Sequence, residues 1–211
     1  HTLVMSATPI PRTLALIIYG DLDISILDEL PPGRQKIETY AVGGDKRERA
    51  YRYVKKHLDE GRQGYIVCPL VEEGETELAA AQEYADRLSQ GFFRGYSVGL
   101  MHGRLKAKEK EQIMASFAAG SIQLLVSTTV IEVGVDVPNA AIMLIENAER
   151  FGLSQLHQLR GRIGRSGFKS TCVLISDAQN DEAKQRLKVM TQTTDGFKIA
   201  DEDLKLRGPG D

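Results

Sequence analysis

The stretch Gln155-Leu-His-Gln-Leu-Arg-Gly-Arg-Ile-Gly-Arg-Ser-Gly167 carries the strongest pattern in this sequence. If it is helical, spacings of four and three residues place Gln158, Arg162 and Arg165 on one face. Residues 150–169 contain five Lys or Arg and no Asp or Glu, although the 211-residue chain has a formal charge of −2. Because a planar, always-charged guanidinium matches phosphate oxygens, the segment predicts a phosphate-binding surface.

Two glycines interrupt the predicted helix, and a glycine costs about 1 kcal/mol relative to alanine inside a helix. Their presence indicates that another group approaches the helix backbone closely at Gly161 and Gly164. The alternative interpretation is a solvated basic face whose glycines mark the end of the helix.

The composition, with 42% hydrophobic and 27% charged residues, is typical of a soluble globular protein. No apolar run is long enough to span a membrane and no secretion signal occurs, so we expect a cytoplasmic protein without a membrane partner. Cys68 and Cys172 lie in apolar runs without metal-ligand spacing, which predicts two buried, reduced thiols and no metal site. A pI near 6.2 excludes a generally basic surface, so any contact with a polyanion must be local.

Apolar runs rich in β-forming residues alternate with longer segments of helical periodicity, which is typical of a parallel sheet with helices on both faces. The predicted strands are Ile37–Val42, Gly64–Pro69, Tyr96–Leu100, Ile122–Ser127, Ala141–Glu146 and Ser170–Ser176. The predicted helices are Lys46–Glu60, Glu75–Gln90, Lys106–Ala119, Leu153–Arg162 and Asp181–Thr191. The expected fold class is therefore α/β.

The first 33 residues do not follow this alternation. A predicted strand at His1–Ala7, a turn and a short apolar segment at Thr13–Tyr19 cannot bury a core of their own. Leu30-Pro-Pro-Gly-Arg34 is a linker that neither a helix nor a central strand can cross. We therefore expect residues 1–33 to be the trailing edge of a preceding domain, with Leu14–Tyr19 packed against the following lobe or against a second copy.

Three further segments place chemically useful side chains where predicted strands end. Ser6-Ala7-Thr8 ends the first apolar run, and a turn or cap is its default interpretation. Gly99-Leu-Met-His-Gly103 leads into a helix start, where backbone N–H groups suit phosphate oxygens, although a lone histidine is more often structural. Val126-Ser-Thr-Thr129 and Glu132-Val-Gly-Val-Asp136 fit the crevice where open α/β sheets bind ligands, or an ordinary loop with capping hydroxyls.

In order and spacing these segments resemble the motifs of the second RecA-like lobe of superfamily-2 nucleic-acid helicases. Ser6-Ala7-Thr8 is similar to motif III, Tyr65–Val71 to motif IV, Leu125–Asp136 to motif V and Gln158–Arg165 to motif VI. Asp28–Arg34, Ile145–Gln155, Asp195–Phe197 and Asp203–Gly210 are similar, more narrowly, to the RecG type of branch-migration helicase. The resemblance implies a RecA-like helicase C-terminal lobe over residues 34–178, followed over residues 179–211 by the start of a truncated helical hairpin for translocation.

The resemblance also implies roles for individual residues. Gln158, Arg162 and Arg165 would face ATP as catalytic residues, with the arginines acting as fingers on its γ-phosphate. Residues near the nucleotide would be Glu132, Gly134 and Asp136. Residues touching the DNA backbone would be Pro69, His102, Gly103, Ser127, Thr128 and Thr129. Ser6 and Thr8 would couple nucleotide state to DNA binding, and Arg186 and Arg207 would belong to the translocation hairpin.

The chain contains no GxxxxGK[ST] phosphate loop and no Walker B acidic pair, so arginine fingers alone cannot position ATP, Mg²⁺ and water. ATP and Mg²⁺ are therefore expected to bind mainly to a missing N-terminal lobe, and neither to this lobe alone. The partners implied are branched or forked duplex DNA, that lobe and a wedge domain of the same parent chain, in a monomeric motor that remodels stalled forks and Holliday junctions.

Three alternatives remain at this point. The equivalent lobe of the transcription-repair coupling factor shares much of the pattern, including the Leu-Arg-Gly ending, although a different linker is expected there in place of Glu29-Leu-Pro-Pro-Gly33. A non-catalytic, DNA-binding RecA-like module would not need Arg162 and Arg165. A small-molecule α/β enzyme is the weakest option, because no nucleophile–base pair or dinucleotide-binding fingerprint occurs.

Overall fold

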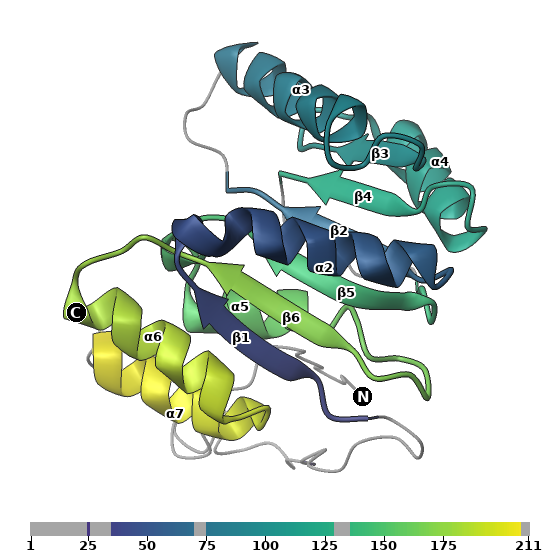
Figure 1. The fold of residues 1–211 in the computed structure, drawn as a ribbon. Coiled ribbons are helices and arrows are strands. Elements are labelled where there is room, and N and C mark those ends of the chain that lie inside the picture. Colours follow the sequence, from purple (N-terminus) through teal and green to yellow (C-terminus); the bar gives the residue numbers. More distant parts are fainter. Residues whose placement is uncertain (1–24, 26–34, 70–74, 129–135, 208–211) are drawn as a thin grey trace, which may run out of the picture.

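The structure is a computed structural model, and it describes residue 25 and residues 35–69, 75–128 and 136–207 (Figure 1). The predictions for Ser6 and Thr8, for the domain at residues 1–33 and for the packing of Leu14–Tyr19 lie outside the described residues. The same holds for Thr129, Glu132 and Gly134.

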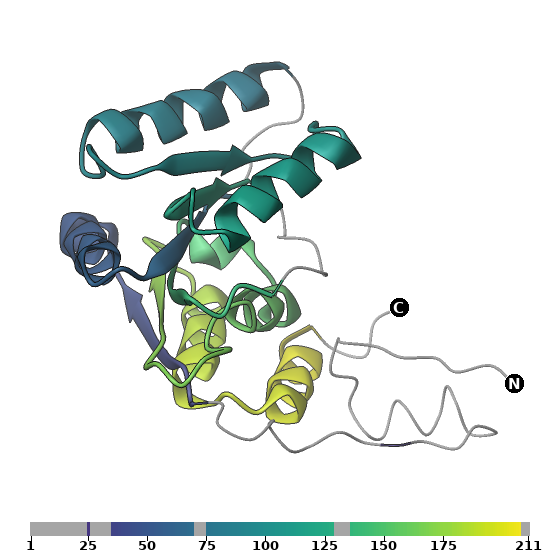
Figure 2. The same cartoon turned by 90° about the vertical axis from the view of Figure 1, so that its right-hand side faces the viewer.

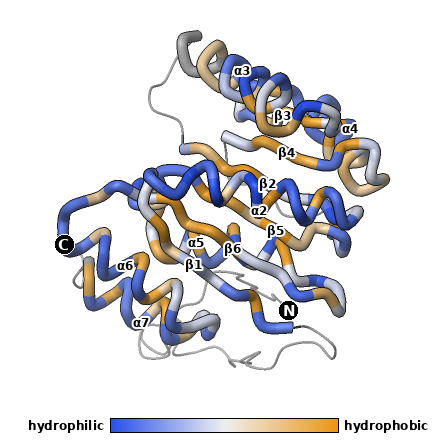
Figure 3. The backbone as a smooth tube through the Cα atoms, in the orientation of Figure 1, coloured by the Kyte–Doolittle hydropathy of each residue, from blue (hydrophilic) through white to orange (hydrophobic). Residues whose placement is uncertain are grey.

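A six-stranded, all-parallel sheet forms the centre of the molecule, in the order β1-β6-β5-β2-β4-β3. The strands are β1 (Glu38–Val42), β2 (Gln63–Val67), β3 (Val98–Met101), β4 (Leu124–Ser127), β5 (Ala140–Ile145) and β6 (Thr171–Ile175). Every residue of the four central strands is buried. Figure 3 shows that hydrophobic residues predominate along these strands. The predicted α/β class, with its parallel sheet, is confirmed.

Helices cover both faces of the sheet, as the edge-on view in Figure 2 shows. They are α2 (Arg47–Asp59), α3 (Glu75–Gln90), α4 (Ala107–Ala118), α5 (Leu153–Arg160), α6 (Asp181–Gln192) and α7 (Gly196–Arg207), with short 3-10 turns η1 (Gly44–Lys46) and η2 (Ala148–Arg150). Two hydrophobic clusters follow from this arrangement. One unites α2 and α3 with one face of the sheet, and the other unites α4 to α7 with the opposite face.

Gly44 shows why α2 begins where it does. Its N–H donates to the Oδ1 of Asp177, which follows β6, at 2.7 Å. A Cβ at this position would collide with the Asp177 carboxylate, so only glycine allows the approach. The contact ties the start of η1 and α2 to the carboxyl end of β6.

The predicted boundaries agree with the structure within two residues, and the two-residue difference at the end of the basic helix has a consequence for the arginines. α5 ends at Arg160, with Gly161 as its C-cap, and the chain continues in tight turns that include the bond from the Ile163 N–H to the Arg160 carbonyl. Gly164 has a φ of 73°, which other residues rarely adopt, and a Cβ there would lie 2.7 Å from Ile37. The glycines therefore mark the end of the helix, and the prediction that Gln158, Arg162 and Arg165 share one helical face is wrong.

The segment after β6 folds as two helices, α6 and α7, joined at Thr193–Asp195 and packed on one another and on α5. Leu187 and Met190 of α6 and Ile199 of α7 belong to the same hydrophobic cluster as α5. The hairpin is thus anchored on the lobe, while its assignment as a separate unit starting at residue 179 stays a prediction.

Candidate functional site

The loops that follow β2, β4 and β3 meet at the carboxyl edge of the sheet, because these three strands are parallel neighbours. Pro69 follows β2, Ser127 and Thr128 end β4, and His102 and Gly103 follow β3. Backbone hydrogen bonds extend the ladder past the strand ends: the Cys68 N–H donates to Ser127 O at 2.8 Å, and the Thr128 N–H donates to Met101 O at 3.0 Å. The structure therefore brings together those predicted DNA-binding residues that it describes.

Two polar atoms at this edge are buried without a hydrogen-bond partner in the described part of the chain, namely Thr128 Oγ1 and His102 Nδ1. The pKa of the His102 imidazole is lowered, mainly by burial, so the ring is neutral at neutral pH. A buried polar atom without a partner is rare in folded proteins. Gly99 lies within β3, as the predicted strand Tyr96–Leu100 has it, and is close to Ile122.

The turns after α5 bring Arg165 next to Asp136 and close to Arg162. The Nη1 of Arg165 lies 3.4 Å from the Oδ1 of Asp136, and its Nε donates to Gly161 O at 3.3 Å. Burial, and then the charge of Arg165, lower the pKa of the Arg162 guanidinium. The charges of all three residues also act on the buried Tyr65 hydroxyl, whose pKa is raised mainly by burial. Gln158 lies earlier, on the last turns of α5.

This arrangement concentrates positive charge at one point. Two guanidiniums are close enough to repel one another, and Asp136, which pairs with Arg165, is more than half exposed. An anion with two or more negative charges, such as a terminal phosphate, would relieve this repulsion and bind bidentately. No cluster of three or more His, Cys, Asp or Glu suited to a metal ion occurs among the residues that the structure describes.

Arg160 has a structural role that the sequence did not reveal. Its side chain is only 2% exposed, and its Nη1 donates to Met190 O at 2.7 Å, to Thr193 O at 3.0 Å and to Thr39 Oγ1 at 3.2 Å. It therefore joins α5 to the end of α6 and to β1. The signal was present, because Arg160 follows Leu156 by four residues and so lies on the apolar face of the helix.

Glu146, the residue after β5, was also missed as a polar centre. Its carboxylate is 5% exposed and accepts hydrogen bonds from Tyr51 Oη at 2.7 Å, Arg47 Nε at 3.0 Å and Tyr84 Oη at 3.3 Å. Its own N–H donates to Val67 O at 2.8 Å. Glu146 thus joins α2 and α3 to the carboxyl edge where β2 and β5 end.

The predicted translocation residues lie on the hairpin. Arg186 donates from Nη2 to Glu149 O at 3.0 Å, and its Nη1 lies 3.5 Å from Glu182 Oε1, so it connects α6 to η2. Arg207 is the last residue of α7. Both cysteines are free thiols, as predicted. Cys172 is buried, whereas Cys68 is only half-buried and so differs from the prediction in its exposure. None of the described helices is both long and apolar enough to cross a membrane.

Residues 45–167 match the family model of the helicase conserved C-terminal domain, and the chain belongs to this family. Within it, the chain is similar over 99% of its length to the ATP-dependent DNA helicase RecG of Bacillus subtilis, at 52% identity over 210 residues. It also superposes on a solved structure of RecG bound to a three-way DNA junction, with a TM-score of 0.86, 52% identity and 99% of this chain covered.

The chain spans 31% of the Bacillus relative and 27% of the junction-bound chain. A more distant match, Saccharomyces cerevisiae Dbp5 bound to RNA and ADP BeF3, covers 95% of this chain and 46% of its own at 17% identity and a TM-score of 0.54. At that identity the likeness shows the fold alone.

Proposed function

We propose that this chain is the C-terminal motor lobe of a RecG-type, ATP-dependent DNA helicase that acts on branched duplex DNA. The observation that carries the proposal is the pair of neighbouring guanidiniums of Arg162 and Arg165, the second of them beside Asp136, in a chain that is 52% identical to RecG over nearly its whole length. Such a pair fits a phosphate group that a neighbouring lobe presents.

In this proposal Arg162 and Arg165 bind the γ-phosphate of ATP held by the N-terminal lobe, together with Gln158. Asp136 orients Arg165, and Glu132 and Gly134 line the same cleft between the lobes. ATP hydrolysis supplies the free energy of movement, and the lobe that binds the nucleotide also holds Mg²⁺. The repulsion between the two arginine charges supports this role, because a bound anion would relieve it.

DNA would lie along the carboxyl edge of the sheet. Pro69, His102, Gly103, Ser127, Thr128 and Thr129 would contact its sugar–phosphate backbone, which gives affinity without reading the base sequence. The unpartnered Thr128 Oγ1 and His102 Nδ1 support this placement. Ser6 and Thr8 would couple nucleotide state to that contact.

The α6–α7 hairpin, with Arg186 and Arg207, would transmit movement of the arginine segment to translocation. Support comes from Arg160, whose guanidinium bonds the last turn of α5 to the α6–α7 connection. The junction-bound relative supports branched DNA as the substrate, so remodelling of stalled forks and Holliday junctions by a monomeric, cytoplasmic motor with a wedge domain is the proposed activity.

The test is ATP hydrolysis and strand separation by the full-length protein with a three-way junction, compared with a linear duplex of equal length. We expect the junction to stimulate hydrolysis and to be unwound. Equal stimulation by the linear duplex would reject branched DNA as the substrate, and an absence of hydrolysis with both would reject the motor.

A further inference from the structure

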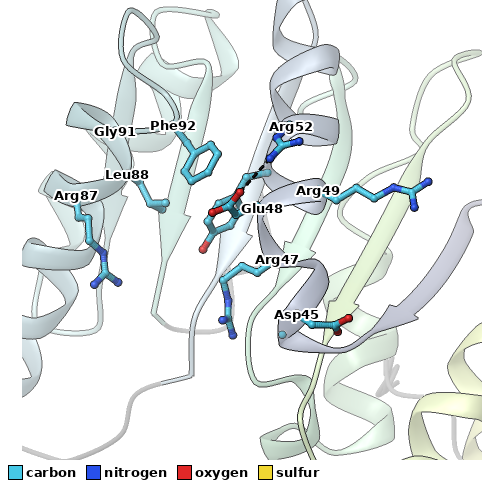
Figure 4. A pocket seen from close by; sticks show the side chains of 11 residues that line it. Asp45, Arg47, Glu48, Arg49, Arg52, Arg87, Leu88, Gly91 and Phe92 are labelled. Carbon is cyan, nitrogen blue, oxygen red and sulfur yellow. Dashed lines mark hydrogen bonds and ion pairs between the residues drawn. The ribbon is translucent and has the colours of Figure 1, made fainter.

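A second group of arginines surrounds a groove between α2 and α3, on the face of the sheet opposite α5 (Figure 4). The groove encloses about 760 Å³. Its charged lining residues are Arg47, Arg49, Arg52, Arg87, Asp45 and Glu48. Positive charge therefore exceeds negative charge here, although the whole chain is slightly acidic.

Two of these arginines are held in place by contacts beneath the groove. Arg47 donates from Nε to Glu146 at 3.0 Å, and the guanidinium of Arg87 lies 5.4 Å from the centre of the Tyr84 ring. Figure 4 shows both side chains pointing into the same space from opposite sides. The ion pair with Glu146 orients Arg47, which lowers the conformational entropy that this donor loses on binding an anion, whereas Arg87 is exposed.

The carboxylates of the groove leave this pair available. Glu48 forms its ion pair with Arg52, at 2.9 Å, and both side chains are well exposed. Arg49 forms no ion pair with any described residue, and it points away from the groove in Figure 4. Arg47 and Arg87 are thus the donors that face the space directly, with Nη atoms of Arg47 not used by Glu146.

An aromatic ring lies beside the two donors. Phe92 lines the groove and is 38% exposed, one of four large hydrophobic residues exposed in the described part of the chain. Its ring packs edge-on against Tyr51, with centroids 5.3 Å apart, which fixes its orientation. Guanidiniums beside an exposed aromatic ring are the combination by which proteins bind single-stranded nucleic acid, through phosphates and a stacked base.

We propose that this groove binds a single strand of nucleic acid, with phosphates between Arg47 and Arg87 and a base stacked on Phe92. A duplex would not present a free base face to the ring. The groove shares no lining residue with the set proposed to contact duplex DNA. The inference rests on the proposed function in one respect: a motor that separates DNA strands would release a single strand close to this lobe.

The first experiment is photocrosslinking with the full-length protein. A labelled oligothymidylate containing 5-iodouracil is irradiated with the protein while unlabelled three-way junction saturates the duplex site, and the crosslinked peptide is identified by mass spectrometry. We expect a crosslink to the peptide that contains Phe92, and its loss in Phe92→Ala. Crosslinks confined to other peptides would overturn the proposal.

Affinity for the same oligonucleotide gives an independent measurement. Arg87→Glu should weaken binding by about tenfold and reduce the slope of log affinity against log salt by about 0.7, the value for one lost phosphate contact on a single strand. Arg94→Glu is the matched control, since Arg94 is exposed close to the groove but does not line it. Equal effects of the two variants would overturn the proposal.

Polyglutamate distinguishes a nucleic-acid site from a site for an acidic protein. Two results together would overturn the proposal: polyglutamate competes in a way that depends on Arg87, and Phe92→Ala leaves oligonucleotide binding unchanged. The ligand of the groove would then be an acidic protein. Junction-stimulated ATP hydrolysis by the wild-type protein, measured in parallel, separates the outcomes. If the protein hydrolyses ATP but no crosslink to the Phe92 peptide forms, the proposed groove site is rejected and the motor function stands. If the crosslink forms but ATP is not hydrolysed, the motor function is rejected and the groove site stands.

Discussion

Arg165 Nη1 lies 3.4 Å from Asp136 Oδ1, and this ion pair joins the turn after α5 to the loop that precedes β5. The side chains are 32% and 57% exposed, so the pair is solvated. An exposed ion pair of this kind contributes about 0–1 kcal/mol, which orients the guanidinium without fixing it. A phosphate brought by another lobe can therefore replace Asp136 as the partner of Arg165 at little cost.

Replacing Arg165 by Ala should remove nearly all ATP hydrolysis by the full-length protein. Loss of an arginine finger lowers turnover by about 10³–10⁵-fold in enzymes of this chemistry. The thermal stability should change little, because the contacts of this side chain with the described residues are an exposed ion pair and one long hydrogen bond. Steady-state hydrolysis with a three-way junction is the measurement, and Arg94→Ala is the control. A variant that keeps more than a tenth of wild-type turnover would show that Arg165 is not a finger.

The isolated 211-residue chain should not hydrolyse ATP, with or without DNA. Its sequence contains no GxxxxGK[ST] loop, so no part of it can enclose the β- and γ-phosphates. Weak DNA binding that falls steeply as salt rises is expected from the same chain. Hydrolysis above the uncatalysed background, inhibited by Arg165→Ala, would contradict the assignment of nucleotide binding to another lobe. DNA affinity equal at low and high salt would contradict the backbone contact.

Arg160→Met should destabilise the fold by about 2–4 kcal/mol, because two buried carbonyls, Met190 O and Thr193 O, lose a charged donor. The melting temperature should fall by roughly 5–15 °C for a chain of this size. Arg150→Met, at an exposed position of η2, should change stability by about 0.5 kcal/mol or less. Similar melting temperatures for the two variants would mean that Arg160 does not hold α5 to the hairpin.

The sequence was sufficient for the fold because parallel strands buried on both faces leave a clear record: β2, β4, β5 and β6 are mostly apolar runs. It was insufficient where spacing alone was used. Spacings of three and four are helical only while the helix lasts, and Gly161 ends it before Arg162. The family resemblance named Arg162 and Arg165, but Glu146 and Arg160 were missed, because their importance arises from partners roughly 30 to 120 residues away.

Stability should fall as the pH rises above about 8.5, and Cys172 should contribute to that fall. Burial raises the pKa of this thiol to about 12, while an exposed thiol in the unfolded chain titrates near 8.5. The folded state therefore holds its proton over a pH range in which the unfolded state has lost it. The stabilisation is complete below about pH 8.5 and is lost as the pH rises towards 12, by up to about 1.4 kcal/mol per pH unit.

Chemical denaturation at pH 8, 9 and 10 measures this slope, and Cys172→Ala is the comparison. The variant starts from a lower stability, since it leaves space in the core, but its free energy of unfolding should decline less steeply with pH. Buried Tyr51, Tyr65 and Tyr84, whose pKa values burial also raises, add to the decline at higher pH in both proteins. Parallel curves for the two proteins between pH 8 and 10 would show that the Cys172 thiol ionises equally in the folded and unfolded states.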